Sequence, residues 1–563
     1  METRSFFLLL ISIAIVHARP NFHFEIDDDE PQAKYASVVL DSKTKEMLIK
    51  DGKVVPYVSC AAFKNTMNTT GWSLLKVSTN GSYSDEQQAV AAGMVEGYIT
   101  AEQISMAYQN SFAHYCDDKK EFCDKFRTFV SQNTAWIQSQ IKANPKSSYW
   151  HQVSLVYQQF SGLEMGYHAS KVKPDLTWVE FSYFQLSGDM EDLEQALTKK
   201  PSNKKVVGSG SCSALVKLFE KNQDLAISQV TWNDFNAMLR IYKMYNFSHH
   251  EYTGGPLISG AIESFSSYPG VLYSGDDFYI LSSGLVTQET TIGNSNSELW
   301  KYISPQTVLE GVRTCVANRL AKSGNEWCSL FETHNSGTYN NQWMILDYKL
   351  FEPGKDLKPD TLWILEQLPG IVHMADQTVL LQQQGYWASY NIPYFPYIYN
   401  ISGVSASKAK YGSWFDYNLN PRAQIFKRDH GKVSDMQSLV KLMRYNNFKK
   451  DPISKCNCTP PYSAENAISA RSDLNPAKGT YPFGALGHRR HGGTDCKATS
   501  FAMAKKLSQF IVAGPTSDDQ PPFQWSKTEW KRPLGHPDTF KFEPLLLDWS
   551  LEQWTDHPDV VVY

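Results

Sequence analysis

The spacing of hydrophobic and polar residues changes abruptly in the middle of the chain. From Asp189 to Lys199, apolar residues recur at three- and four-residue steps, which predicts a helix with one apolar stripe. Residues 202–211 are mostly small and polar, a composition typical of an exposed and cleavable loop. From Cys212 to Phe219 every second residue is apolar, which predicts a strand. Cys212 is therefore expected to begin a buried strand directly after a flexible loop.

A second strand is predicted from Leu225 to Trp232, because this run is again largely apolar. The polar residues 220–224 between the two strands are typical of a hairpin turn. Folding the chain about the middle of this turn places Thr231 and Trp232 alongside Cys212.

Two more hairpins are predicted downstream. One pairs Asp277–Leu281 with Leu285–Thr290, and the other pairs Gln342–Phe351 with Leu362–Glu366. The chain has no internal repeat and no linker of the usual composition, and aromatic residues are plentiful from end to end. We therefore expect one large domain, or two fused ones, of the α+β class, with strand pairs between helices.

The first 18 residues are expected to be a signal peptide, because a charged start is followed by the apolar run Phe6–Val16 and a small-residue cleavage site at Ala18. The mature chain would then begin near Arg19. The alternative is a membrane anchor, but a span needs about 20 apolar residues and this run is shorter. No later stretch is long and apolar enough to cross a bilayer, so we expect no transmembrane segment.

The charge of the chain limits the classes of partner it can bind, and its predicted glycosylation sites indicate the cellular compartment. The net charge is -4, with no cluster of Lys and Arg that could neutralise phosphates, so we expect no nucleic-acid partner. Sites for N-linked sugar are predicted where an Asn is followed two residues later by Ser or Thr. These sites are Asn68, Asn80, Asn246, Asn400 and Asn457. Together with the signal peptide, they predict a glycoprotein that is secreted or delivered to lysosomes.

The chain has 9 cysteines, so in an oxidising compartment at least one thiol stays unpaired or bonds outside the chain. Cys116 and Cys123 lie close enough in sequence to close a small loop. Cys456 and Cys458 lie in a Pro-rich turn that favours a local bridge. These four are disulfide candidates, although spacing alone leaves the connectivity open.

Cys212 follows a Gly- and Ser-only approach, so its thiol can attack the carbonyl of Ser211 without bulky side chains in the way. The acyl group would shift from nitrogen to sulfur, and hydrolysis of the thioester would leave Cys212 as a new N-terminus. An α-amine has a pKa of about 7.7–8.0, so it can serve as the base for its own side chain. The alternative is a buried structural cysteine, since free Cys is among the most buried residue types.

Longer blocks of sequence occur in a consistent order along nearly the whole mature chain. They are Gly208–Leu215, Thr231–Asn233, Ser266–Gly270, Asp276–Ile280, Ser283–Thr287, Glu289–Asn294, Asn335–Trp343, Tyr386–Pro393, Pro421–Phe426, Leu442–Asn446 and Asn466–Asn475. Taken together, they resemble the signature blocks of the phospholipase B-like family of lysosomal and secreted proteins. The resemblance implies an N-terminal nucleophile hydrolase fold, in which two stacked antiparallel sheets lie between helices in four αββα layers. It also implies self-cleavage into associated fragments 19–211 and 212–563.

The same resemblance implies roles for single residues. Cys212 would be the nucleophile, Trp232 and Thr291 would line the site near its thiol, Asn391 would help to bind the oxyanion, and Arg422 would steady the site electrostatically. An Asn amide aimed at a developing oxyanion contributes about 3–4 kcal/mol to lowering the barrier. Alternatively, Trp232 and Asn391 are packing and capping groups, and Arg422 belongs to a buried ion pair.

One position departs from the family pattern. Many members carry a histidine in the strand before the Thr-Trp pair, where this chain has Gln229. Gln forms hydrogen bonds but exchanges no proton near neutral pH. If that histidine assists catalysis or self-cleavage, we expect either to be slower here or to depend wholly on the α-amine.

Other catalytic classes find little support. The sequence has no G-x-S-x-G elbow of a serine lipase and no papain-type cysteine block. The pairs His488 with His491 and His249 with His250 lack the spacing of a metal site, so we expect solvated loops there, no metal and no cofactor.

Three functional hypotheses follow. The first is an acyl hydrolase that deacylates phospholipids in lipid catabolism through Cys212, as the family name implies. The second is an amidase acting on N-acyl lipids or peptides. The third is a glycoprotein that binds lipid without turnover, an alternative that Gln229 keeps open.

Overall fold

The computed structural model describes residues 33–198, 206 and 210–549 of the chain, and an antiparallel sheet of 11 strands with one parallel pair forms its centre. The order of the strands is β13-β12-β11-β10-β9-β8-β7-β4-β3-β1-β2. Their bounds are β1 Lys34–Leu40, β2 Met47–Asp51, β3 Ser59–Thr66, β4 Trp72–Thr79, β7 Ile241–Asn246, β8 Ile262–Ser267, β9 Phe278–Leu281, β10 Leu285–Thr291, β11 Asn341–Asp347, β12 Leu362–Leu368 and β13 Ile371–Asp376. The expected signal peptide, residues 1–18, lies outside the described residues.

A smaller sheet of 7 strands has the order β14-β5-β6-β16-β17-β20, with β15 paired to β6. Its strands are β5 Cys212–Leu218, β6 Leu225–Asp234, β14 Tyr386–Ser389, β15 His491–Gly493, β16 Asp495–Ser500, β17 Gln509–Ala513 and β20 Leu545–Leu547. Strands β18 Phe523–Gln524 and β19 Thr539–Phe540 form a separate pair. In the β5–β6 hairpin Cys212 lies opposite Thr231, which confirms the predicted register.

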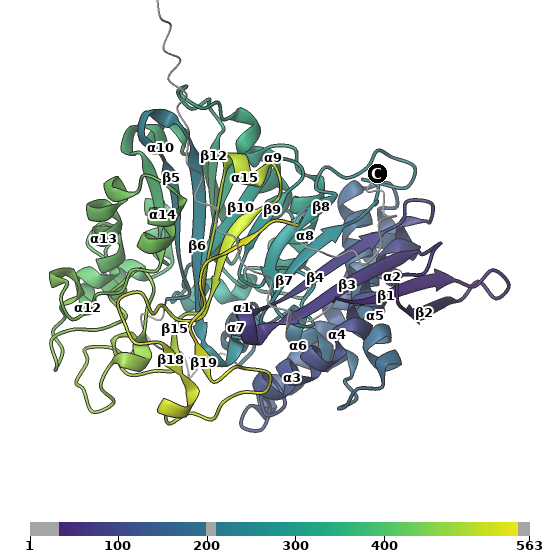
Figure 1. The fold of residues 1–563 in the computed structure, drawn as a ribbon, viewed down its shortest axis with the longest axis horizontal. Helices are drawn as coiled ribbons and strands as arrows, with labels where there is room; N and C mark the ends of the chain where they lie inside the picture. Colours follow the sequence, from purple (N-terminus) through teal and green to yellow (C-terminus); the bar gives the residue numbers. More distant parts are fainter. Residues whose placement is uncertain (1–32, 199–205, 207–209, 550–563) are drawn as a thin grey trace, which may run out of the picture.

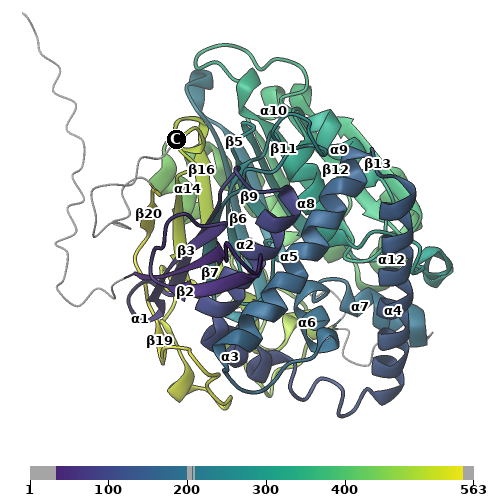
Figure 2. The same ribbon diagram turned by 90° about the vertical axis from the view of Figure 1, so that its right-hand side faces the viewer.

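Helices cover the outer faces of both sheets (Figures 1 and 2). The helices are α1 Met67–Thr70, α2 Asp85–Ile99, α3 Ala101–Ser111, α4 Lys120–Ala143, α5 Ser148–Ser170, α6 Trp178–Gln185, α7 Met190–Thr198, α8 Glu310–Leu320, α9 Gly324–Glu332, α10 Thr378–Gln384, α11 Pro396–Ile401, α12 Val404–Tyr411, α13 Pro421–Asp429, α14 Met436–Met443 and α15 Phe501–Ala504. The helix expected from Asp189 is confirmed as α7.

Three apolar cores separate these layers. Residues of α2, α8 and α9 pack on one face of the large sheet. The other face of that sheet packs against β5 and β6 of the small sheet. The outer face of the small sheet is covered by α13 and α14. The chain is therefore a layered α+β protein, with Cys212 at the start of a strand of the inner small sheet.

Helices α2 and α5 approach each other unusually closely. Gly93 and Gly97 of α2 face α5, where a Cβ atom would lie 1.9 Å and 2.1 Å from the carbonyl oxygens of Gln159 and Leu163. Gly166 of α5 makes the reciprocal approach, at 2.0 Å from the Met94 oxygen. Only glycine leaves room for backbone contact of this kind, so these residues set the distance between the two helices.

The predicted hairpins downstream are largely confirmed. Strands β9 and β10 pair, as do β11 and β12. The strand expected as Gln342–Phe351 ends earlier, because the Asp347 side chain accepts a hydrogen bond from the Lys349 N–H and residues Tyr348–Leu350 form a 3₁₀ turn. Of the described residues, no helix is long and apolar enough to span a membrane.

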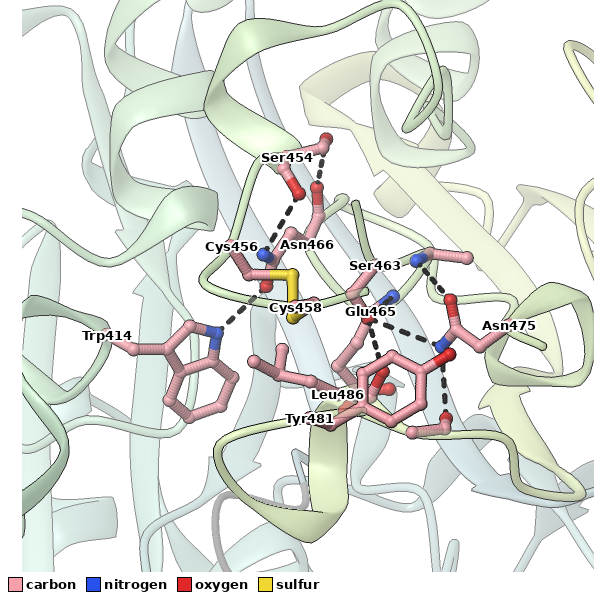
Figure 3. Close-up of a disulfide and its surroundings, with 12 residues drawn as sticks. Trp414, Ser454, Cys456, Cys458, Ser463, Glu465, Asn466, Asn475, Tyr481 and Leu486 are labelled. Atoms are coloured by element: carbon pink, nitrogen blue, oxygen red, sulfur yellow. Dashed lines mark hydrogen bonds between the residues drawn. A yellow bond between two sulfur atoms is a disulfide. The ribbon is translucent and has the colours of Figure 1, made fainter. Parts of the chain in front are cut away.

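Two disulfides, Cys116–Cys123 and Cys456–Cys458, match the pairs of candidate cysteines. Figure 3 shows the second beside Trp414, whose indole N–H donates to Asn466 at 2.9 Å. The apolar cluster around this disulfide includes Val206. The disulfide loop therefore contributes to the burial of that side chain.

Candidate active site

Cys212 is the first residue of β5, and β5 is an inner strand that pairs with β14 on one side and β6 on the other. Its side chain is 3% exposed. The thiol donates to Oε1 of Glu289, with 3.9 Å between sulfur and oxygen. Burial, followed by the charge of Glu289, raises the pKa of the Cys212 thiol well above its ordinary value. The thiol is therefore protonated in the intact chain and needs a proton acceptor before it can attack.

Both backbone polar groups of Ser211, the residue before Cys212, are held by hydrogen bonds. The backbone N–H of Trp232 donates to the Ser211 carbonyl at 2.5 Å. The Ser211 N–H donates to Oδ1 of Asn391 at 3.2 Å. The preceding Gly210 is buried, so the expectation of an exposed loop is wrong at this residue, because the chain turns inward here to reach β5.

The orientation of the Asn391 amide is fixed by its neighbours. Its Nδ2 donates to the Thr291 carbonyl at 2.7 Å, and its Oδ1 accepts from Nη1 of Arg422 at 2.8 Å. A guanidinium has no acceptor, so the atom facing Arg422 is the oxygen. In the intact chain Asn391 thus presents an acceptor to Ser211, whereas the donor at the Ser211 carbonyl is the Trp232 N–H. The oxyanion role expected for Asn391 stays a prediction for turnover.

Arg422 is delivered by the first turn of α13, which begins at Pro421 with Asn420 as its N-cap. Its guanidinium donates to the carbonyl oxygens of Cys212 at 2.6 Å and Tyr390 at 2.7 Å. The same group lies 4.3 Å from the ring centre of Trp232. Burial lowers the pKa of Arg422 to about 10, and the side chain remains charged at neutral pH.

The structure brings the five expected site residues together. Trp232 is further anchored by its indole N–H, which donates to the Ile468 carbonyl at 3.1 Å. Thr291 ends β10 and contributes its backbone carbonyl rather than its side chain to the hydrogen bond with Asn391. Residues from β5, β6, β10, α13 and the loop after β14 thus converge on the Ser211–Cys212 peptide.

Two residues of the site were missed from the sequence. Glu289 contacts the thiol, and its only signal was a charged residue within a strand that is otherwise apolar or uncharged. His491 lies on β15, where the β15–β6 pairing brings its ring to 6.5 Å from that of Trp232. Burial, with Arg489 and Arg422, holds the pKa of His491 well below its ordinary value, so the ring is neutral.

Gln229, the residue expected to replace a family histidine, is fully buried on β6. Its amide donates to the carbonyls of Asp276 at 2.8 Å and Glu289 at 2.6 Å. Gln229 thus ties the small sheet to the strand that carries Glu289. It fixes the position of Glu289 without exchanging a proton.

Comparisons with known proteins identify the family. The sequence model of the family described as Phospholipase B matches residues 59–547, which is most of the chain. This chain belongs to the phospholipase B family. Relatives named "Putative phospholipase B-like 2" in Mus musculus and Homo sapiens are 49% and 48% identical to it, over 93% and 92% of this chain and 90% of each relative. "Phospholipase B-like protein B" of Dictyostelium discoideum is 37% identical, over 86% of this chain and 84% of its own length.

This phospholipase B family member also holds a group of buried carboxyls beside Glu289. Asp277, Glu289 and Glu310 lie within electrostatic reach of one another, and Asp189 acts on Asp277 and Glu310. Burial raises the pKa of Asp189 to about 6 and that of Asp277 to about 7. Burial, followed by the charge of Asp277, raises the pKa values of Glu289 and Glu310 well above the ordinary range. These groups are neutral at acidic pH.

The family member is therefore expected to be more stable in acid than at neutral pH. Burial also raises the pKa of Glu263 and of Glu366 to about 7. When folding raises the pKa of a carboxyl, its contribution to the stability of the folded state is fully present below the unfolded pKa of about 4.3. That contribution is lost as the pH rises through the folded pKa of about 7. We expect the melting temperature to fall by several degrees between about pH 5 and pH 8. Glu263→Gln should reduce that fall, and an unchanged melting temperature in the wild type would contradict the prediction.

The histidine pairs show no metal site. Among residues 33–198, 206 and 210–549, no group of three His, Cys, Asp or Glu side chains could hold a metal ion. His249 is fully buried rather than solvated, because the chain after β7 folds back over the start of α2. His250 and His151 instead bind Asp85, each at 2.9 Å.

Proposed function

We propose that this protein is an N-terminal nucleophile hydrolase that cuts acyl bonds after it has cleaved itself between Ser211 and Cys212. The single observation that carries the proposal is the geometry of this peptide. Its carbonyl accepts from the Trp232 N–H at 2.5 Å, while the following thiol begins a buried strand and contacts a carboxyl group. The succession of helices, large sheet, small sheet and helices supports the same fold class.

Self-cleavage would proceed in two balanced steps. The sulfur of Cys212 forms a bond to the Ser211 carbonyl carbon, the carbon–nitrogen bond breaks, and the thiol proton passes to the nitrogen that becomes the α-amine. The Trp232 N–H stabilises the negative charge that develops on the carbonyl oxygen. Water then hydrolyses the thioester, which leaves a carboxylate on Ser211 and restores the thiol of Cys212.

Glu289 is proposed as the group that relays the thiol proton to the departing nitrogen, because its neutral carboxyl is in hydrogen-bond contact with that sulfur and can accept a proton at one oxygen while it gives one up from the other. Glu289→Gln keeps the shape of the side chain but cannot relay a proton. We expect self-cleavage to slow by about 10²–10⁴-fold, the usual contribution of general acid–base catalysis. Intact mass measured against time would give the rate.

Glu263→Gln is the matched control for this substitution. Glu263 is also a buried carboxyl, but it lies beside Arg319, at 3.9 Å, rather than beside the thiol. Self-cleavage at the wild-type rate is expected in this control. Equal rates in the Glu289 variant and the wild type would remove Glu289 from the mechanism.

After cleavage, the two fragments 19–211 and 212–563 are proposed to remain associated. The N-terminal fragment contributes β1 to β4, and β4 pairs with β7 of the other fragment in the middle of the large sheet. Helix α5 of the N-terminal fragment also packs on α8 of the C-terminal fragment. Separation would expose both surfaces to water, so the fragments hold together without a covalent bond.

In turnover, Cys212 would attack the acyl carbonyl of a substrate and its α-amine would carry the proton. Phospholipid deacylation in lipid catabolism is the reaction that the family description suggests. Hydrolysis of N-acyl lipids or peptides is the alternative, and it is favoured by the amide that the site already holds at Ser211.

A panel of phospholipids and N-acyl amides, assayed with the self-cleaved protein, tests turnover. We expect the wild type to release acid from at least one substrate, and Cys212→Ala to release none. Equal signals from both proteins would end the enzyme proposal and favour a glycoprotein that binds lipid without turnover.

We propose secretion or delivery to the lysosomal lumen as the destination. Asn68, Asn400 and Asn457 are exposed, and Asn80 and Asn246 are partly exposed, so each predicted glycosylation site reaches the surface. Two disulfides and the raised pKa values of the buried carboxyls agree with an oxidising compartment that can become acidic.

A further inference from the structure

The residues just before Cys212 occupy the site as a bound peptide would. Both backbone polar groups of Ser211 are recognised. The Ser211 N–H donates to Asn391, and the Ser211 carbonyl accepts from the Trp232 N–H. The site therefore offers an acceptor followed by a donor, which matches the N–H and carbonyl of a peptide residue.

The contact with Asn391 allows the site to discriminate between an aminoacyl group and a fatty acyl group. Its Oδ1 is held as an acceptor by Arg422 at 2.8 Å, while its Nδ2 is bound to the Thr291 carbonyl at 2.7 Å. The amide cannot turn over without losing both bonds. The second lone pair of Oδ1 faces the Ser211 N–H, at 3.2 Å, next to the carbonyl that is cut. A fatty acyl chain has a methylene at that place and offers no donor.

The position of Gly210 is also restrictive. A Cβ atom there would lie 2.9 Å from Oδ1 of Asn391 and 3.1 Å from both Nη2 of Arg422 and Cε3 of Trp232. These three side chains are fixed by their own hydrogen bonds and by the stacking of Arg422 on Trp232. The site has room for a glycine at this position and for no larger residue.

We propose that the site filled by Gly210 and Ser211 is the acyl subsite of the mature enzyme, and that its substrate is a glycyl-aminoacyl amide. Such a substrate is a short peptide or N-acyl peptide with an N–H next to the scissile carbonyl and a glycine before it. This inference rests on the proposed function, because it requires Cys212 to be the nucleophile. The Ser211 end of the N-terminal fragment leaves the subsite when the substrate enters.

Four fluorogenic substrates that share the leaving group 7-amino-4-methylcoumarin test the inference. The assay uses the self-cleaved protein with both fragments present. The reference is acetyl-Gly-Ser. The second replaces the N–H of Ser with an ester oxygen, the third replaces Gly with Val, and the fourth carries an octanoyl group. We expect kcat/KM for the reference to exceed each of the others by about tenfold or more, because the others lack the donor or the space. In Asn391→Ala the preference over the ester analogue should disappear.

The possible failures can be told apart. If the ester analogue or the octanoyl substrate is cleaved as fast as the reference, the glycyl-aminoacyl subsite is refuted and the proposed function stands. The same holds if the protein hydrolyses phospholipid but none of the peptides. If it hydrolyses none of these substrates, the proposed function fails as well. The wild-type ratios decide the question even if Asn391→Ala does not fold.

Discussion

Cys212→Ala is expected to leave the chain in one piece, whereas we expect the wild type to yield a fragment that starts at Cys212. The alanine side chain cannot form the thioester, and no other cysteine adjoins the same peptide bond in the sequence. Alanine also fits the buried start of β5, so the fold should be retained. Loss of cleavage should therefore be complete rather than partial.

N-terminal sequencing and intact mass of both proteins after incubation at acid pH would measure this result. Cys496→Ala is the matched control, since Cys496 is a free thiol that is 1% exposed on β16 of the same small sheet. We expect this control to cleave as the wild type does. An identical fragment from Cys212→Ala would indicate an outside protease, and an uncut wild type would mean that no maturation occurs.

Gly93→Ala is expected to destabilise the protein strongly, by at least about 3 kcal/mol, the upper end of the usual cost of overpacking. The new methyl group would lie 1.9 Å from the carbonyl oxygen of Gln159 and 2.6 Å from the Leu163 nitrogen. Both neighbours are backbone atoms of a helix, which cannot move aside as a flexible side chain could. Helices α2 and α5 would have to separate, and the core beneath them would loosen.

Thermal unfolding and the yield of folded protein would measure the effect. Gly431→Ala is the control, because a Cβ atom at Gly431 would meet no atom within 4 Å. The control should melt at the wild-type temperature. A melting temperature of Gly93→Ala equal to that of the control would show that the two helices separate at little cost.

The local structure around Cys212 was determined by the sequence. The spacing of apolar residues placed a helix before the loop and a strand from Cys212, and the polar turn set the register that puts Thr231 opposite Cys212. Such features depend on residues that are close together in the sequence, so periodicity and turn composition are sufficient to predict them. The Cys116–Cys123 and Cys456–Cys458 pairs were accessible for the same reason.

The resemblance to the family supplied the residues that surround Cys212, and it could not supply their contacts. Only the tertiary structure decided that Asn391 presents its oxygen to Ser211, since that orientation depends on Arg422 from a distant helix. It also brought Glu289 and His491 to the site, through the packing of two sheets and the pairing of β15 with β6.

The close approach of α2 and α5 was decided in the same way. A glycine in a helix has no signal of its own until the facing helix is known. The sequence by itself thus determined the elements that local patterns encode and the family that long blocks of residues indicate. The tertiary structure decided which side chains meet, because contacts between residues far apart in the chain depend on how the layers pack.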